Sequence, residues 1–261
     1  MRQMVVIRSY SVRHPAGVVR LPQTGDWDQL IYASRGVVRL TTDASTFVLP
    51  SLRAAWVPAG IEHHCRVADG TRMRTLYIHR SMKLFGADTT VLELSSFARE
   101  LIGHMVEFSP WFEDDPLTSS HLDVLLSTLR SADVAPLSLP RPVDEIAARA
   151  GGLLEADPGS DATVDELARD VGVSRRTLER TFQADVGMSV GQWRQQLRLV
   201  VGLERLAAGT PVGRVAVDLG YATQSAYGAM FKAHLGCSPG AYFSTGRASA
   251  QTSALNPSRT R

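Results

Sequence analysis

The second half of this chain contains one sequence pattern twice, and no other feature restricts its possible folds as much. The first copy begins at Thr163 (TVDELARDVGVSRRTLERTFQADVGMSVGQW) and the second at Pro211 (PVGRVAVDLGYATQSAYGAMFKAHLGCSPGAY). Equivalent residues lie 48 positions apart up to the central glycine and 49 positions apart after it, so the second copy has one extra residue in a turn. A repeat of this kind indicates two copies of one supersecondary motif.

Each copy predicts a helix-turn-helix. A short helix ends at Gly172 or Gly220, where a left-handed turn favours glycine. The next helix follows Ser174 or Thr223, both residue types that cap helices. Apolar residues four positions apart would then face the core, namely Leu178 with Phe182 and Tyr227 with Phe231. The second helix of such a motif lies in the major groove of DNA.

Charged side chains gather on the second helix of the first copy. Arginine can hold N7 and O6 of guanine with two hydrogen bonds, which contributes about 1–3 kcal/mol of discrimination, and glutamate can accept from cytosine N4. In the second copy the amide of Gln224, the hydroxyl of Ser225 and the ammonium group of Lys232 offer less direct readout of the bases. A solvated charged face is the alternative for any single arginine. The predicted DNA-binding residues are Ser174, Arg175, Arg176, Glu179, Arg180, Gln224, Ser225 and Lys232.

The segment between the two motifs predicts a helix of about 18 residues, about 27 Å long at 1.5 Å per residue. A rod of this length can hold two recognition helices about one DNA turn apart, roughly 34 Å. Arg194, Arg198 and Arg205 on this rod face either phosphates or solvent. The region 163–247 carries ten basic and seven acidic residues, and the rest carries eighteen and nineteen, which is consistent with a nucleic-acid partner.

These motifs resemble the DNA-binding domain of the AraC/XylS family of bacterial transcription regulators over about 143–242. The ending F-K-x-x-x-G-x-S-P-x-x-Y is also present, as Phe231, Lys232, Gly236, Ser238, Pro239 and Tyr242. The resemblance implies promoter binding and an N-terminal domain that senses a ligand or dimerises. By position it places Arg176, Glu179 and Arg180 at base contacts, with Gln224, Ser225 and Ala229 at the equivalent places. Many members have arginine where Ala229 stands.

The remainder of the chain predicts a second, β-rich domain, so that the fold class is α+β with several domains. Short apolar runs separated by Gly, Pro, Asp and Ser predict strands over 1–90, in a sandwich or small barrel. Amphipathic helices are expected in 91–134, as a connector or dimerisation region. A proline-rich linker at 135–142 precedes the DNA-binding domain at 143–247, and a disordered tail is expected at 248–261.

The N-terminal region resembles a cupin, the small β-barrel that precedes this DNA-binding domain in part of the family. The similar stretch runs from about Asp26 to Ile78, and its segment Pro58–His63 fits the cupin pattern P-x-G-x-x-H. Aromatic and polar residues on the predicted strands are candidates for binding a small effector. They are Gln29, Tyr32, Trp56, His63, Tyr77 and His79. The alternative for each is packing inside the barrel.

The sequence does not indicate an enzyme. Cupins usually supply an H-x-H pair before the strand that holds Gln29, but the stretch 21–27 contains no histidine. His63 and His64 are adjacent, so in a strand they point to opposite faces. The chain has no G-x-G-x-x-G loop and no Walker-type loop. We therefore expect no catalytic residue, no metal and no cofactor.

We thus predict a sequence-specific DNA-binding transcription regulator controlled by a small-molecule effector. The alternatives are a cupin metalloenzyme with secondary DNA binding, and a regulator whose barrel only dimerises. The expected partners are double-stranded promoter DNA, an unknown effector, RNA polymerase as a candidate, and a second copy in a homodimer. Cys65 and Cys237 form no C-x-x-C pattern, and no apolar run approaches the roughly 20 residues that span a bilayer, so we expect a cytoplasmic protein without membrane contact.

Overall fold

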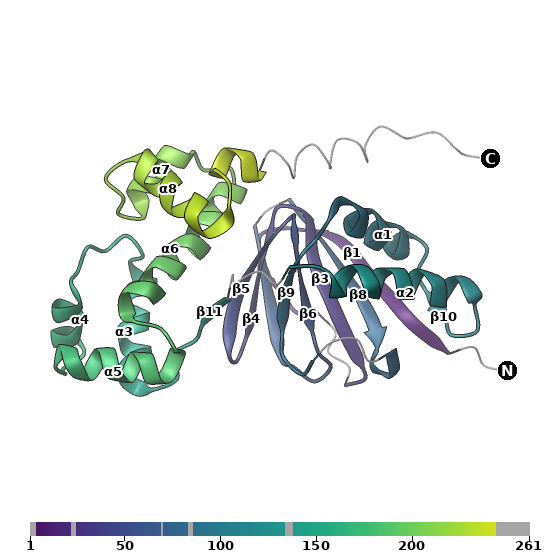
Figure 1. The fold of residues 1–261 in the computed structure, drawn as a ribbon, viewed down its shortest axis with the longest axis horizontal. Helices are drawn as coiled ribbons and strands as arrows, with labels where there is room; N and C mark the ends of the chain where they lie inside the picture. The colour runs from purple at the N-terminus through teal and green to yellow at the C-terminus, as the bar shows by residue number, and fades with distance from the viewer. Residues whose placement is uncertain (1–3, 22–24, 69, 83–85, 134–137, 244–261) are drawn as a thin grey trace. The chain divides into compact units, whose positions relative to one another are not determined.

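The protein forms two compact units, of which the first is rich in strands and the second in helices (Figure 1). This confirms the predicted α+β fold class. The computed structural model describes the chain in five stretches: 4–21, 25–68, 70–82, 86–133 and 138–243. The tail predicted at 248–261 and the predicted linker up to residue 137 lie outside the described residues.

The first unit comprises 4–42 and 49–133 of the described residues, and its larger sheet has six strands. Their spatial order is β10-β1-β8-β3-β6-β9. The bounds are β1 (Val5–His14), β3 (Trp27–Arg35), β6 (Arg53–Val57), β8 (Thr71–His79), β9 (Thr90–Glu93) and β10 (Trp111–Phe112). A short 3-10 helix, η1 (Arg80–Met82), follows β8.

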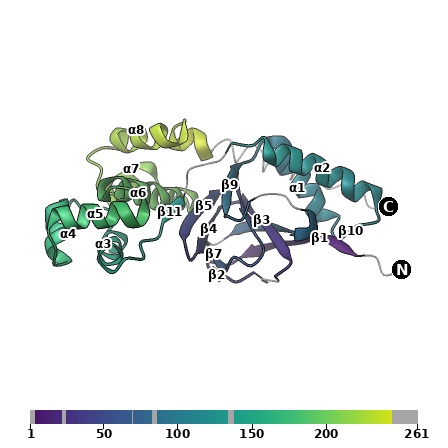
Figure 2. The same cartoon turned by 60° about the horizontal axis from the view of Figure 1, so that its bottom comes forward.

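Two helices cover one face of this sheet, α1 (Ser96–Glu107) and α2 (Pro116–Arg130) (Figure 1, Figure 2). Both begin at side-chain caps, since Ser95 accepts from the backbone N of Ala98 and Asp115 from that of Leu117. Because side chains alternate across a strand, only one residue in two along β3, β6 and β8 faces these helices. The residues that pack on them include Leu30, Tyr32, Ala54, Trp56, Leu76 and Ile78.

The first unit also contains β2 (Gly17–Val19), β4 (Val37–Thr42) and β7 (His63–Val67), and β7 pairs antiparallel with the other two. Along β7 the burial alternates strictly, so His63, Cys65 and Val67 are buried while the two residues between them are exposed. The turn from β3 to β4 passes through Gly36 with φ +85°, and a Cβ there would lie 2.6 Å from the Thr71 hydroxyl. Only glycine fits this turn without a shift.

The second unit contains both copies of the repeat. Its helices are α3 (Glu145–Ala156), α4 (Val164–Asp170), α5 (Arg175–Val186), α6 (Val190–Ala207), α7 (Val212–Asp218) and α8 (Gln224–Leu235). The pairs α4–α5 and α7–α8 are the two predicted helix-turn-helix motifs, and α6 runs from one to the other (Figure 1). Its 18 residues agree with the predicted length. Among the described residues, no helix is long and apolar enough to cross a membrane.

The helix boundaries in the repeat confirm the predicted caps. The Ser174 and Thr223 side chains accept hydrogen bonds from the backbone N of Thr177 and Ala226, each three residues on. Both second helices end at a left-handed glycine, Gly187 with φ 72° and Gly236 with φ 76°. The same residue types therefore start and stop the helix in each copy.

The second unit includes a strand pair in addition to the helices. β5 (Ser45–Pro50) lies largely in this unit and pairs antiparallel with β11 (Ser138–Pro140), with Leu139 opposite Thr46. The buried indole of Trp193 in α6 donates to the Pro140 carbonyl at 2.8 Å. Three residues further on, the Val143 backbone N donates to the Asp185 carboxylate in α5. Residues 138–143 are therefore fixed to the helices that follow them.

Candidate nucleic-acid interface

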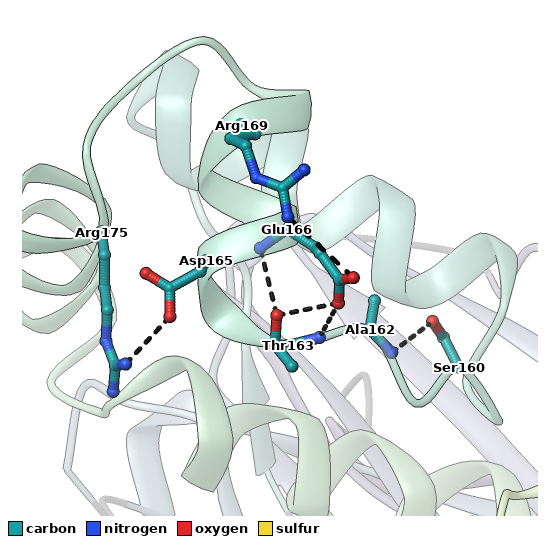
Figure 3. Close-up of polar contacts among 7 residues, drawn as sticks. All are labelled: Ser160, Ala162, Thr163, Asp165, Glu166, Arg169 and Arg175. Carbon is teal, nitrogen blue, oxygen red and sulfur yellow. Dashed lines mark hydrogen bonds and ion pairs between the residues drawn. The ribbon is translucent and has the colours of Figure 1, made fainter.

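The first motif is held at its start by a capping box on α4 (Figure 3). The Thr163 hydroxyl accepts from the Glu166 backbone N at 3.2 Å, and the Glu166 carboxylate accepts from the Thr163 backbone N at 2.7 Å. The hydrogen bonds from Thr163 lower the pKa of Glu166, because they stabilise its charged form. The cap therefore fixes where α4 begins, and the turn at Gly172 then fixes where α5 begins.

The outer face of α5 carries two arginines that are available to a partner. Leu178, Phe182 and Val186 are buried, whereas Arg176 and Arg180 on the opposite side are exposed. Within the described stretches, neither arginine has an ion-pair partner. A spacing of four residues places the two guanidinium groups on one side of the helix.

Two other predicted contact residues are directed into the motif itself. Nη1 of Arg175 lies 3.0 Å from Oδ2 of Asp165 in α4, so this arginine ties the two helices together (Figure 3). The Glu179 carboxylate accepts from the backbone N of Val190, the first residue of α6, at 3.5 Å. A carboxylate at a helix N-terminus is stabilised by the exposed backbone N–H groups there. Arg175 and Glu179 are thus occupied by intramolecular contacts.

The second motif repeats this arrangement with different side chains. The positions of Asp165 and Arg175 are taken here by Gly213 and Gln224. A Cβ on Gly213 would lie 3.1 Å from the Gln224 amide oxygen, so Gln224 lies against α7 as Arg175 lies against α4. On the outer face of α8, Ser225 and Lys232 are exposed. The outer face of α8 therefore carries one cation, Lys232, where that of α5 carries two, Arg176 and Arg180.

The arginines of α6 are largely used inside the protein. Arg198 donates to the carbonyls of Pro158 and Ser160, each at 2.8 Å, and Arg205 forms an ion pair with Asp218 at 3.1 Å. The third, Arg194, is half-buried, and burial lowers its pKa, with Arg198 adding to the effect. Arg198 and Arg205 hold the neighbouring segments in place, which leaves the outer faces of α5 and α8 as the candidate interface.

The candidate effector residues of the first unit fall on two different faces of the six-stranded sheet. Tyr32 and Trp56 are buried in the core shared with α1 and α2, and Tyr32 accepts a hydrogen bond from Arg74. Gln29 and Tyr77 are directly opposite each other on neighbouring strands, and both point to the other face. Packing against α1 and α2 therefore explains why Tyr32 and Trp56 are buried.

The two histidines among these candidates differ in setting. His63 on β7 is buried, and its Nδ1 lies 2.8 Å from the Ile61 carbonyl. Burial lowers the pKa of His63, so the imidazole is neutral at pH 7. His79 is near one end of β8, where its ring packs edge-on against Trp27 with 5.3 Å between centroids. Within the described residues, no three His, Cys, Asp or Glu side chains are placed to hold a metal ion.

Buried polar atoms gather around Tyr77. Burial raises the pKa of Tyr77, with smaller contributions from nearby Cys65 and Tyr10, and burial alone raises the pKa of Cys65 to about 12. Both side chains are therefore neutral and protonated at pH 7. The Tyr77 hydroxyl, the Gln29 amide oxygen and the Thr75 hydroxyl are buried without a hydrogen-bond partner among the described residues. Such atoms are suited to a ligand or an ordered water.

Comparisons with known proteins agree with both units. The family models for a helix-turn-helix domain and for an AraC-like ligand-binding domain match residues 167–245 and 10–137. The "HTH-type transcriptional regulator NimR" of Escherichia coli (strain K12) is 30% identical over 214 residues, which are 82% of this chain and 78% of NimR. A "Putative AraC-like transcription regulator" of Streptomyces antibioticus is 36% identical over 100 residues, 38% of this chain and 33% of that protein.

Two solved structures are similar to parts of this chain or to most of it. The DNA-binding domain of AdpA in complex with a target DNA is 28% identical, with a TM-score of 0.38, over 41% of this chain and 96% of that one. Fatty-acid-bound ToxT from Vibrio cholerae is 11% identical, with a TM-score of 0.37, over 91% and 94% of the two chains. The relation to NimR extends over both units, and with it the chain is assigned to the AraC/XylS family as a DNA-binding transcription regulator with an N-terminal ligand-binding domain.

Proposed function

We propose that this regulator reads promoter DNA with the outer faces of α5 and α8, and that it has no enzymatic activity. The observation that carries this proposal is the pair of exposed arginines, Arg176 and Arg180, on the second helix of a capped helix-turn-helix. In this proposal they contact bases, Ser225 contacts a base from α8, and Lys232 contacts a phosphate. Ser174, Arg175, Glu179 and Gln224 instead hold the motifs in shape. The protein then acts in the cytoplasm, where RNA polymerase meets it at promoters.

A footprint on DNA upstream of the protein's own gene and its neighbours tests the proposal. Two recognition helices joined by an 18-residue helix should protect about two turns of DNA. Protection should weaken as salt rises, because bound arginine and lysine release counterions from phosphates. A complete lack of protection at low salt would contradict the assignment of α5 and α8 to DNA.

We also propose that a small effector binds beside Tyr77 in the first unit. Support comes from the buried and unpaired oxygens of Gln29, Thr75 and Tyr77, together with the neutral state of Tyr77 and Cys65. A buried polar atom that gains a hydrogen bond from a ligand recovers free energy that it lacks in the empty protein. The ligand can alter transcription only if it favours one conformation of the regulator over another.

Replacing Tyr77 by phenylalanine should weaken effector binding about fivefold, which corresponds to roughly one hydrogen bond of about 1 kcal/mol. Thermal unfolding of the full chain against a library of small compounds identifies binders, which raise the unfolding temperature of the wild type. Tyr32→Phe is the matched control, since Tyr32 lies on the other face of the sheet and should leave binding unchanged. Equal weakening by both variants, or no binder in the library, would count against this site.

Finally, we propose that α1 and α2 form a homodimer interface. Four apolar side chains are exposed there, Phe97, Phe108, Leu117 and Val124, with exposed fractions of 56, 60, 61 and 43%. His104 of α1 and His121 of α2 stack on each other with 5.2 Å between ring centroids, and His104 also contacts the Phe108 ring at 4.6 Å. An exposed apolar surface of this kind is typical of a protein contact site.

The double substitution Phe108→Glu and Leu117→Glu should convert the dimer to monomer in sedimentation experiments, because each places a charge in the apolar contact. Val217→Glu, at an equally exposed valine in α7 (68%), is the control and should leave the mass unchanged. A monomeric wild type would show that this surface does not dimerise.

A further inference from the structure

The two recognition helices are copies of one motif, but the chemistry of their outer faces differs. The repeat aligns Arg176 with Ser225 and Arg180 with Ala229. All four residues are exposed on the side opposite the buried core of their helix. At the two central positions, therefore, α5 has long cations and α8 has a hydroxyl and a methyl group.

Small residues continue around the exposed side of α8. Ala226, Ala229 and Ala233 are all exposed, while Tyr227, Met230 and Phe231 fill the opposite side. The long side chain at the start of the helix, Gln224, is exposed, and its amide oxygen lies beside Gly213 of α7. The exposed surface of α8 therefore carries three alanine methyl groups, beside the polar side chains of Gln224, Ser225, Lys232 and His234.

Such a surface reads DNA in a particular way. A base pair with thymine presents a methyl group in the major groove, and this group is recognised by apolar contact with residues such as alanine. Guanine is recognised by the forked or extended cations of arginine and lysine. Short side chains also let the helix backbone lie closer to the base edges than a helix covered with arginines can.

We propose that α8 recognises thymine methyl groups, mainly through Ala229 with its exposed alanine neighbours, while α5 recognises guanine through Arg176 and Arg180. The inference rests on the proposed function, in which both outer faces contact bases. It predicts an operator with two chemically different half-sites, one rich in guanine on either strand and one defined by thymines. Ala229 is then a specificity-determining residue of this regulator.

Selection of random DNA duplexes with the full chain provides the operator for the test. The half-site whose guanines lose enrichment with Arg176→Ala belongs to α5, and the other belongs to α8. Replacing each thymine of the α8 half-site by deoxyuridine removes only the methyl group. We expect about fourfold weaker binding for each contacted thymine, the value for one buried methyl group. The same replacement in the α5 half-site should have no effect.

Two substitutions of Ala229 test whether the difference between thymine and uracil depends on α8. Ala229→Gly should abolish the difference between thymine and uracil at one position, whereas Ala184→Gly on the exposed side of α5 should leave it unchanged. Ala229→Arg should change the selected base at that position to guanine, a gain that a misfolded protein cannot show. The inference would be overturned if α5 selects guanine but the α8 half-site shows no preference for thymine, or if replacing its thymines by deoxyuridine does not weaken binding. Failure to enrich either half-site would instead overturn the proposed DNA-binding faces.

Discussion

Replacing Arg176 or Arg180 by alanine should lower the affinity for the operator about 5- to 150-fold each. This range corresponds to about 1–3 kcal/mol for a bidentate contact to guanine. Both guanidinium groups are exposed and have no ion-pair partner within the described residues, so they are available for this contact. Fluorescence anisotropy with a labelled operator duplex measures the loss.

Arg175→Ala is the matched control, because it removes the same charge from the neighbouring position. Because the Arg175 guanidinium is paired with Asp165 at 3.0 Å, its removal should weaken operator binding much less. A duplex of scrambled sequence gives a second comparison: loss of a base contact should reduce operator binding more than non-specific binding. If Arg175→Ala were as damaging as Arg176→Ala, the outer face of α5 would be wrongly assigned.

Gly220→Ala should destabilise the second unit more than Gly172→Ala, although the two glycines occupy the same place in the repeat. Both have positive φ, 78° at Gly172 and 73° at Gly220, and alanine in that conformation costs about 1–2 kcal/mol. A Cβ on Gly172 would have no neighbour within 4 Å, whereas one on Gly220 would meet the carbonyl oxygen of Gly159. Overpacking of this kind costs about 1–3 kcal/mol more.

The Gly159 carbonyl cannot easily move away, because Arg198 holds the carbonyls on both sides of it. Urea unfolding of the full chain, followed by helical circular dichroism, compares the free energies of unfolding of the two variants. Equal losses would mean that the segment at 158–160 yields to the new methyl group. If the hydrogen bonds from Arg198 are what prevents this shift, Gly220→Ala should lower the free energy of unfolding less in an Arg198→Ala background than in the wild type.

The sequence predicted the repeated motif well because each boundary depends on neighbouring residues. Ser174 and Thr223 cap backbone N–H groups three residues on, and Gly187 and Gly236 adopt the left-handed conformation that ends a helix. Such contacts are local, so the identity of one residue and its spacing from the next are sufficient to find them. The family resemblance follows from the same short-range pattern.

Individual side-chain roles were harder to predict, because they depend on partners in other elements. The position of Arg175 gives its direction around α5, but not that Asp165 in α4 lies within 3.0 Å. Arg198 is held by backbone carbonyls, which have no sequence signature. In the first unit, odd and even numbering separates Gln29 from Tyr32 on β3, yet only the structure shows which face α1 and α2 cover.

The pairing of β11 with β5 has a consequence for dividing this protein. Residues 43–48 belong to the helical unit, although the 88 residues from 49 to 136 separate them from the rest of it. A C-terminal fragment that starts at Ser138 would keep the bond from Trp193 to Pro140 but leave the backbone of β11 without its partner strand. Unpaired strand edges attract other chains and promote aggregation. A single cut in the gene therefore separates the helical unit from residues 43–48, and with them from the partner strand of β11.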